Sequence, residues 1–81
     1  MISEKIKAER ISNVRTKRGL TQQDMAKMLS EMSGNDLFTM TKSVQEWESG
    51  VCFPSLDMYH NLAIVLSVPA EYLMGLSDIA S

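Results

Sequence analysis

The chain has 81 residues, of which 44% are apolar, 6% are aromatic and seven are methionine, so it can form one small domain with a compact core. Ten acidic and eight basic side chains give a net charge of -2, which excludes a uniformly basic nucleic-acid binder but not a local basic face. The single cysteine, Cys52, excludes an internal disulfide and a cysteine metal site, and it indicates a reducing compartment.

Charge is unevenly distributed along the chain. Residues 1–27 carry seven bases and three acids, whereas residues 28–81 carry one base and seven acids. Phosphate attraction acts over about one Debye length, roughly 8 to 10 Å, so a locally basic face can serve an acidic protein.

The amino terminus carries charges where a signal peptide has an apolar run, and the apolar run at residues 62–66 is too short to span a bilayer. We therefore expect a cytoplasmic protein with no membrane association.

Apolar residues at helical spacing predict an amphipathic first helix from about Ser3 to Lys17, ended by Gly19. Its predicted apolar face consists of Ile2, Ile6, Ile11 and Val14.

Thr21, with Asp24 three residues later, predicts a capping box at the start of a second helix over about residues 21–30. Leu20 and Met25 are placed to form the accompanying hydrophobic staple. The predicted buried face of this helix consists of Met25, Ala26 and Leu29.

A strong turn signal, Ser33-Gly34-Asn35-Asp36, follows the second helix. It predicts a lengthened turn over about residues 31–39, unless the second helix runs on to Met32. We expect Leu37 and Phe38 to tuck this turn against the core.

The third helix is expected over about residues 40–49, capped by Thr39 or Thr41 and ended by Gly50 in the left-handed conformation. Val44 and Trp47 form its inward face, and we expect Trp47 to anchor the core rather than to stack on a base.

Pro54-Ser55 predicts the start of a fourth helix that runs to about Ser67, and Pro69 suits the first position of a short fifth helix ended by Gly75. The apolar face of the fourth helix consists of Leu56, Tyr59, Leu62, Ala63 and Leu66. The expected architecture is therefore all-α, one domain over residues 1–81 with five helices around one core.

The segment from Thr21 to Gly50, which opens Thr-Gln-Gln-Asp-Met-Ala and closes Trp-Glu-Ser-Gly, resembles the phage repressor and Cro-like (XRE-type) helix-turn-helix family. The resemblance extends over nearly the whole chain, through residues 15–20, 53–56, 62–63 and 68–73. It implies a compact five-helix, lambda-repressor-like DNA-binding domain. Such a domain inserts its third helix into the major groove of double-stranded DNA and recognises a short palindrome as a homodimer. The implied role is transcription regulation, with repression as the expected mode, and the lengthened turn departs from the family pattern.

The resemblance also implies which residues contact DNA. The base-contacting positions are Thr41, Lys42, Ser43 and Glu46. Lysine can donate to guanine, glutamate can accept from cytosine N4, and the two hydroxyl groups can do either. The implied phosphate contacts are Gln22 and Ser49, with Lys17 and Arg18 adding charge at longer range or serving as solvated surface. Arg15 and Glu48 match a family pair that joins the first and third helices, which we interpret as structural.

Val51 and Cys52 are the predicted dimer contacts, together with the carboxyl-terminal residues Tyr72, Met74, Leu76 and Ile79. The alternative function is a protein-interaction module, such as an antitoxin or anti-repressor component, which Glu46 and the acidic carboxyl-terminal two thirds favour.

His60 is the only histidine, and neither a nucleophile–base pattern nor a phosphate loop is present. We therefore predict no enzyme activity, no cofactor and no metal. The sequence fits both a stand-alone regulator and the amino-terminal part of a longer protein.

Overall fold

Five α-helices joined by short connections form the structure, a computed structural model that describes residues 4–80. The helices are α1 (Glu4–Lys17), α2 (Gln22–Ser33), α3 (Leu37–Ser49), α4 (Leu56–Leu66) and α5 (Ala70–Leu73). No strand occurs within the described residues, so the predicted all-α architecture with five helices is confirmed. The expected helix start at Ser3 and the predicted apolar position Ile2 lie outside the described residues.

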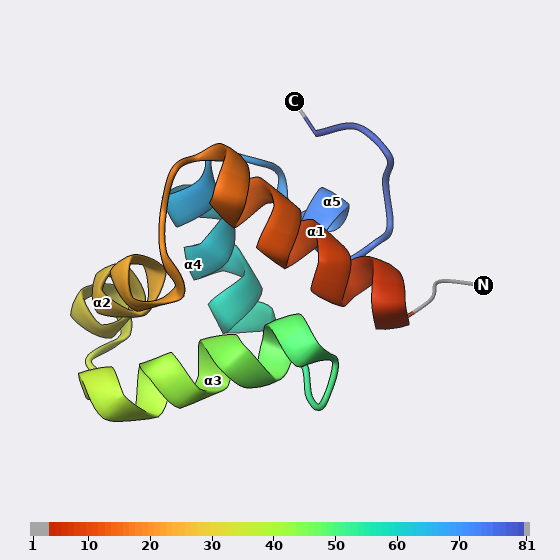
Figure 1. Cartoon of the computed structure of the whole chain (residues 1–81). Coiled ribbons are helices and arrows are strands. Elements are labelled where there is room, and N and C mark those ends of the chain that lie inside the picture. Colours follow the sequence, from red (N-terminus) through yellow and green to blue (C-terminus); the bar gives the residue numbers. More distant parts are fainter. Residues whose placement is uncertain (1–3, 81) are drawn as a thin grey trace.

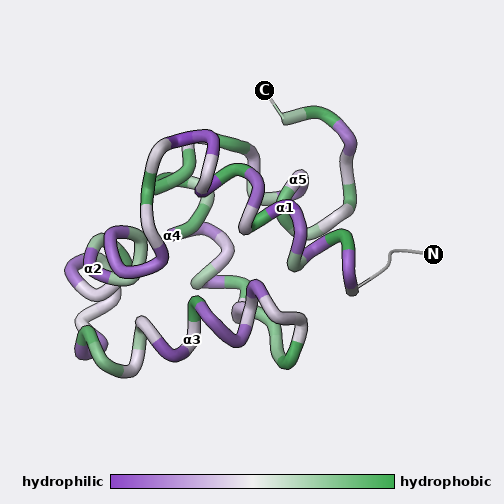
Figure 2. The backbone as a smooth tube through the Cα atoms, viewed as in Figure 1, coloured by the Kyte–Doolittle hydropathy of each residue, from purple (hydrophilic) through white to green (hydrophobic). Residues whose placement is uncertain are grey.

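The helices pack around a single core. α4 occupies the middle of the molecule in Figure 1, with α2 at its left and α3 along the lower edge. α2 packs against both α3 and α4, and α1 packs against α3 and α5. Figure 2 shows hydrophobic and hydrophilic positions alternating along α1, α2 and α3, as expected of helices with one buried face. The residues of these three helices that form the core cluster are Ile11, Val14, Met25, Ala26, Leu29, Met40, Val44 and Trp47.

Thr21 caps α2 as predicted. Its hydroxyl accepts the Asp24 N–H at 3.0 Å, and the Asp24 carboxylate accepts the Thr21 N–H at 3.0 Å. Leu20 packs against the core and Met25 is fully buried, which is the arrangement expected of a hydrophobic staple. The start of α2 is therefore held by contacts within a single turn of chain.

The connection between α2 and α3 is shorter than predicted. α2 continues to Ser33, where Gly34 ends it with a φ of 81°, a left-handed conformation that glycine adopts without steric cost. Asp36 then caps α3, because its carboxylate accepts the Thr39 N–H at 2.8 Å and the Thr39 hydroxyl at 2.9 Å. The predicted lengthened turn over residues 31–39 and the predicted Thr39 or Thr41 cap are wrong. The open alternative, in which the second helix runs on to about Met32, is close to the observed end.

Leu37 and Phe38 belong to the first turn of α3 and are not tucked against the core. Both side chains are exposed, Phe38 by 81%. Because α3 begins at Leu37 rather than near residue 40, the buried position nearest its start is taken by Met40 instead. The prediction that the two residues pack inward is therefore wrong.

α4 and α5 follow the expected order with small shifts. The Ser55 hydroxyl accepts the Met58 N–H at 3.2 Å and caps α4, and α5 begins one residue after Pro69. Leu56 is exposed because its helical position falls at the edge of the face formed by the buried residues Tyr59, Leu62 and Leu66. The Tyr59 hydroxyl has no hydrogen-bond partner among the described residues, and burial raises the pKa of this group.

The capping carboxylates predict a loss of stability in acid. Backbone and hydroxyl donors of Thr21 and Thr39 lower the pKa of Asp24 and Asp36, respectively. A lowered folded-state pKa means that the ionised carboxylates stabilise the fold above their ordinary pKa, and that this stabilisation is lost as the pH falls through the lowered value. We expect the free energy of unfolding, measured by urea denaturation between about pH 5 and pH 2, to fall on acidification. The variant Asp24→Asn/Asp36→Asn should lose less, since asparagine caps helices without titrating, and an equal loss would contradict the assignment.

Candidate nucleic-acid interface

A hydrogen-bonded network joins α1, the α1–α2 connection, the start of α2 and α3. Arg15 Nε donates to Glu48 Oε2 at 2.6 Å, and Arg15 Nη2 donates to Glu48 Oε1 at 2.9 Å. Arg15 Nη1 donates to the Leu20 carbonyl at 2.7 Å, while Gln22 Nε2 donates to Glu48 Oε1 at 3.1 Å. The predicted Arg15–Glu48 pair is therefore present. It is largely buried, with the two side chains 15% and 7% exposed.

This network fixes the side chain of Gln22 and adds no net charge to the surface. The hydrogen bond to Glu48 raises the pKa of Arg15, although burial acts in the opposite direction, so the arginine stays charged and neutralises its partner. Glutamine carries two amide N–H donors, of which Glu48 accepts one. The second amide N–H of Gln22, a half-buried residue at the start of α2, can therefore donate to another acceptor.

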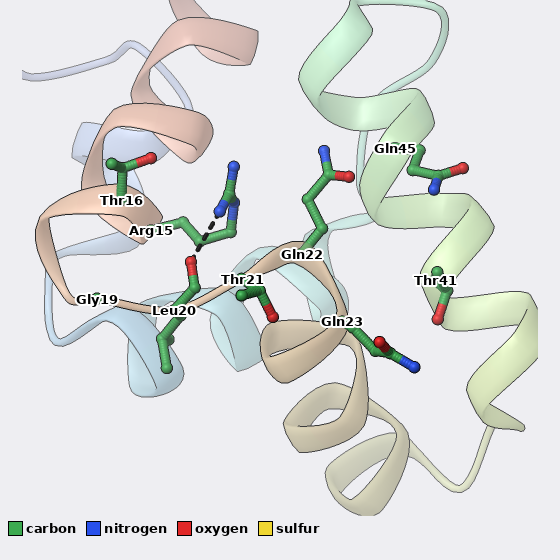
Figure 3. A pocket seen from close by; sticks show the side chains of 9 residues that line it. All are labelled: Arg15, Thr16, Gly19, Leu20, Thr21, Gln22, Gln23, Thr41 and Gln45. Atoms are coloured by element: carbon green, nitrogen blue, oxygen red, sulfur yellow. Dashed lines mark hydrogen bonds between the residues drawn. The ribbon is translucent and has the colours of Figure 1, made fainter.

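A solvent-open cleft lies between the start of α2 and the exposed side of α3. Its lining residues are Arg15, Thr16, Gly19, Leu20, Thr21, Gln22, Gln23, Thr41 and Gln45, none of which is acidic. Figure 3 shows Gln22 and Gln23 on one side of the cleft and Thr41 and Gln45 on the other. The first turn of a helix has backbone N–H groups without partners inside the helix, so this wall suits an anion. Gln23 and Gln45 were not predicted contacts. The i, i+4 spacing of Thr41 and Gln45 is the signal that could have found the latter.

The four predicted base-contacting residues all lie on α3 but in different surroundings. Lys42 is exposed, and Thr41 and Ser43 lie on either side of it, because each residue turns the helix by about 100°. The Thr41 hydroxyl donates to the Leu37 carbonyl at 2.8 Å, and the Glu46 carboxylate accepts from the Cys52 thiol at 3.7 Å. Lys42 is thus the exposed cation of the set.

Arg10 holds the segment after α5 against α1. Its guanidinium donates to the carbonyl oxygens of Tyr72 at 2.8 Å and Ser77 at 2.7 Å, and to the Asp78 carboxylate at 2.7 Å. The same group lies 4.2 Å from the centre of the Tyr72 ring. These contacts give Arg10 a structural role that its sequence position did not indicate.

Arg18 and Lys17 lie away from the cleft. Arg18 donates to the Leu66 carbonyl at 2.8 Å and the Ser67 carbonyl at 3.2 Å, where it satisfies the exposed end of α4. Both residues line a separate groove, which shares no residue with the cleft and is formed by Val14, Lys17, Arg18, Val68, Tyr72 and Ala80. Arg18 therefore has a structural contact, and its phosphate role stays a prediction. All three arginines therefore make hydrogen bonds within the fold.

The predicted dimer residues are accessible only in part. Val51 and Cys52 are exposed in the turn after α3, Val51 by 74%. The Ser49 hydroxyl, just before this turn, donates to the Glu46 carbonyl at 3.0 Å. Of the four carboxyl-terminal residues, Tyr72 and Met74 pack against the core. Leu76 and Ile79 are exposed.

Comparisons of the chain with protein-family models, with curated proteins and with solved structures found no match. Within residues 4–80, no three His, Cys, Asp or Glu side chains come close enough to hold a metal ion, and no helix is long and apolar enough to cross a membrane. His60 is exposed on α4. Function is therefore inferred from the geometry of α2 and α3.

Proposed function

We propose that this domain binds double-stranded DNA, with α3 in the major groove and the start of α2 against the neighbouring phosphate backbone. The observation that carries this proposal is the cleft in which Gln22, held by Glu48, faces Thr41 and Gln45 of α3. The major groove admits one α-helix, and the amide-rich start of a helix suits a phosphate. α3 and the start of α2 lie side by side, as required for one domain to bind the major groove and the phosphate backbone along its edge.

In this proposal, Lys42 donates to guanine and the free amide N–H of Gln22 donates to a phosphate. Thr41 and Ser43 border Lys42 and contact adjacent bases. Glu46 accepts from cytosine N4 and repels phosphates, which lowers nonspecific affinity and increases selectivity.

One short helix contacts few base pairs, so we propose a homodimer on a palindrome, with Val51 and Cys52 between the copies. The proposed role is transcription regulation, with repression as its mode.

A protein-interaction module is the second candidate. The exposed apolar side chains of Val51, Leu76 and Ile79 favour it, as does the engagement of all three arginines within the fold. Such an interface would be insensitive to salt, whereas DNA binding through phosphates weakens as salt rises.

Selection of bound sequences from a randomised duplex pool, repeated at two salt concentrations, tests DNA binding. We expect a palindrome. Affinity for this palindrome should fall as the salt concentration rises, because binding to phosphates releases condensed counterions. No enriched sequence at either salt concentration would sink the proposal in favour of a protein partner.

Lys42→Ala should weaken binding to the selected duplex by about 5- to 150-fold, the range expected for loss of one good base contact. Lys17→Ala is the comparison variant, because Lys17 is also exposed but lines the separate groove, where the loss of a more distant charge should weaken binding less than the loss of a base contact. Affinity is measured by fluorescence anisotropy, and circular dichroism checks that both variants keep their helices. Equal effects of the two substitutions would contradict the proposed placement of α3.

A further inference from the structure

Phe38 has the highest exposed fraction of the large apolar side chains in the described part of the chain, at 81%. It is not part of a loose loop. It lies in the first turn of α3, directly after the Asp36 cap and its hydrogen bonds to Thr39. Its position is therefore set by the helix, so the ring is held in a fixed place for a contact outside the domain.

Helical geometry places Phe38 on the same side of α3 as Lys42. Residues four and eleven positions apart project in nearly the same direction, so Phe38, Lys42 and Ser49 form one exposed line along the helix. The buried residues of α3 lie opposite, namely Met40, Val44 and Trp47. Any surface that meets Lys42 along this line also meets Phe38.

We propose that Phe38 is a specificity-determining residue that contacts the C5-methyl group of a thymine. The inference rests on the proposed function, because it requires α3 to lie in the major groove. The thymine methyl is the apolar group that base pairs present there, and phenylalanine is among the side chains that contact it. Four residues of helix cover about 6 Å, and successive base pairs are about 3.4 Å apart. The thymine should therefore lie about two base pairs from the guanine bound by Lys42.

The surroundings of Phe38 favour a small apolar target over a protein surface. Its exposed neighbours on α3 are Leu37, which is 40% exposed, and the polar residues Thr39, Lys42 and Gln45. The centre of a protein interface is depleted of charged residues, whereas a DNA groove presents isolated methyl groups among hydrogen-bonding edges. A single ring beside a lysine matches the second pattern.

Replacing thymine by deoxyuridine in the selected duplex, one position at a time, removes only the methyl group. For the unmodified protein, we expect one position in each half-site at which this change lowers affinity by about 4-fold, the effect of losing burial of one methyl group. Phe38→Ala should lower affinity for the thymine duplex by at least as much and should no longer distinguish thymine from deoxyuridine. Phe38→Leu should keep the discrimination. Ile64→Ala, an exposed apolar residue on α4, is the matched control and should behave as the unmodified protein.

The outcomes separate this inference from the function on which it rests. If Lys42→Ala weakens binding but deoxyuridine has no effect at any position, DNA binding stands and the role of Phe38 is overturned. The same holds if Phe38→Ala keeps the full methyl discrimination, or if it changes only the self-association of the free protein in sedimentation. If no duplex is selected, both proposals fail. Unchanged thermal unfolding of Phe38→Ala would show that any loss of affinity does not come from unfolding.

Discussion

Replacing Glu48 with alanine is expected to destabilise the domain by about 3 kcal/mol, because it leaves the largely buried guanidinium of Arg15 without its charged partner. The change also removes the acceptor of the Gln22 amide. Arg15→Met/Glu48→Leu should be markedly more stable than Glu48→Ala, since apolar side chains of similar size can replace a buried ion pair at little cost. Urea denaturation of Glu48→Ala, Arg15→Met, Glu48→Leu and the double variant Arg15→Met/Glu48→Leu measures these losses, and the last three variants give the coupling between the two residues.

Glu9→Ala provides the matched control for this experiment. Glu9 forms an exposed ion pair with Lys5 at 3.9 Å within α1, and pairs of this kind contribute little to stability. The Arg15–Glu48 assignment would fail if Glu48→Ala cost no more than Glu9→Ala. It would also fail if the double variant lost the sum of the two single losses.

Trp47→Ala should be the most damaging substitution in α3. The Trp47 side chain is 5% exposed within the core, and truncation of a buried tryptophan costs about 3 to 5 kcal/mol. A domain of this size has a total stability of only about 4 to 12 kcal/mol. We therefore expect the melting temperature, followed by circular dichroism, to fall by at least about 12 °C.

Trp47→Phe keeps an aromatic ring in the core and should lose much less. If Trp47 were instead a stacking platform for a base, Trp47→Ala would leave the melting temperature unchanged and weaken only DNA binding. That result would contradict the placement of Trp47 in the core.

Features that depend on a few neighbouring residues were predictable from the sequence. The Thr21–Asp24 capping box and the left-handed Gly50 involve chemistry within one helical turn. The buried face of α2 followed from the spacing of its apolar residues. The Arg15–Glu48 contact depends on tertiary packing and came from the family resemblance, not from the spacing of the two residues.

The α2–α3 connection was mispredicted because its residues carry two compatible signals. Gly34 and Asp36 fit a long turn, and they equally fit the end of one helix and the cap of the next. Aspartate is a preferred helix N-cap residue, which favours the second interpretation. In the structure, Asp36 caps α3 by accepting the Thr39 N–H. The apolar character of Leu37 and Phe38 predicts burial, but single apolar side chains are common on protein surfaces, and both are exposed.

The roles of Arg10 and Arg18 were not predictable from a local pattern. Each donates to backbone carbonyl oxygens far along the chain, at separations of 62 and 48 residues for Tyr72 and Leu66. Every residue has such a carbonyl, so no side-chain pattern marks the acceptor. A count of charges along the sequence therefore does not show which cations also hold the fold together.

The contacts of Arg10 also bear on the order in which the domain can fold during synthesis. α1 is made first, yet Arg10 bonds to Asp78, which is 68 residues later. At about 5 to 20 residues per second, roughly 3 to 14 s separate the synthesis of the two residues. Until α2, α3 and α4 have been synthesised, Ile11 and Val14 lack most of the residues that bury them. The nascent chain therefore carries an incompletely covered amphipathic helix during part of this interval, and the Arg10–Asp78 contact can form only at its end.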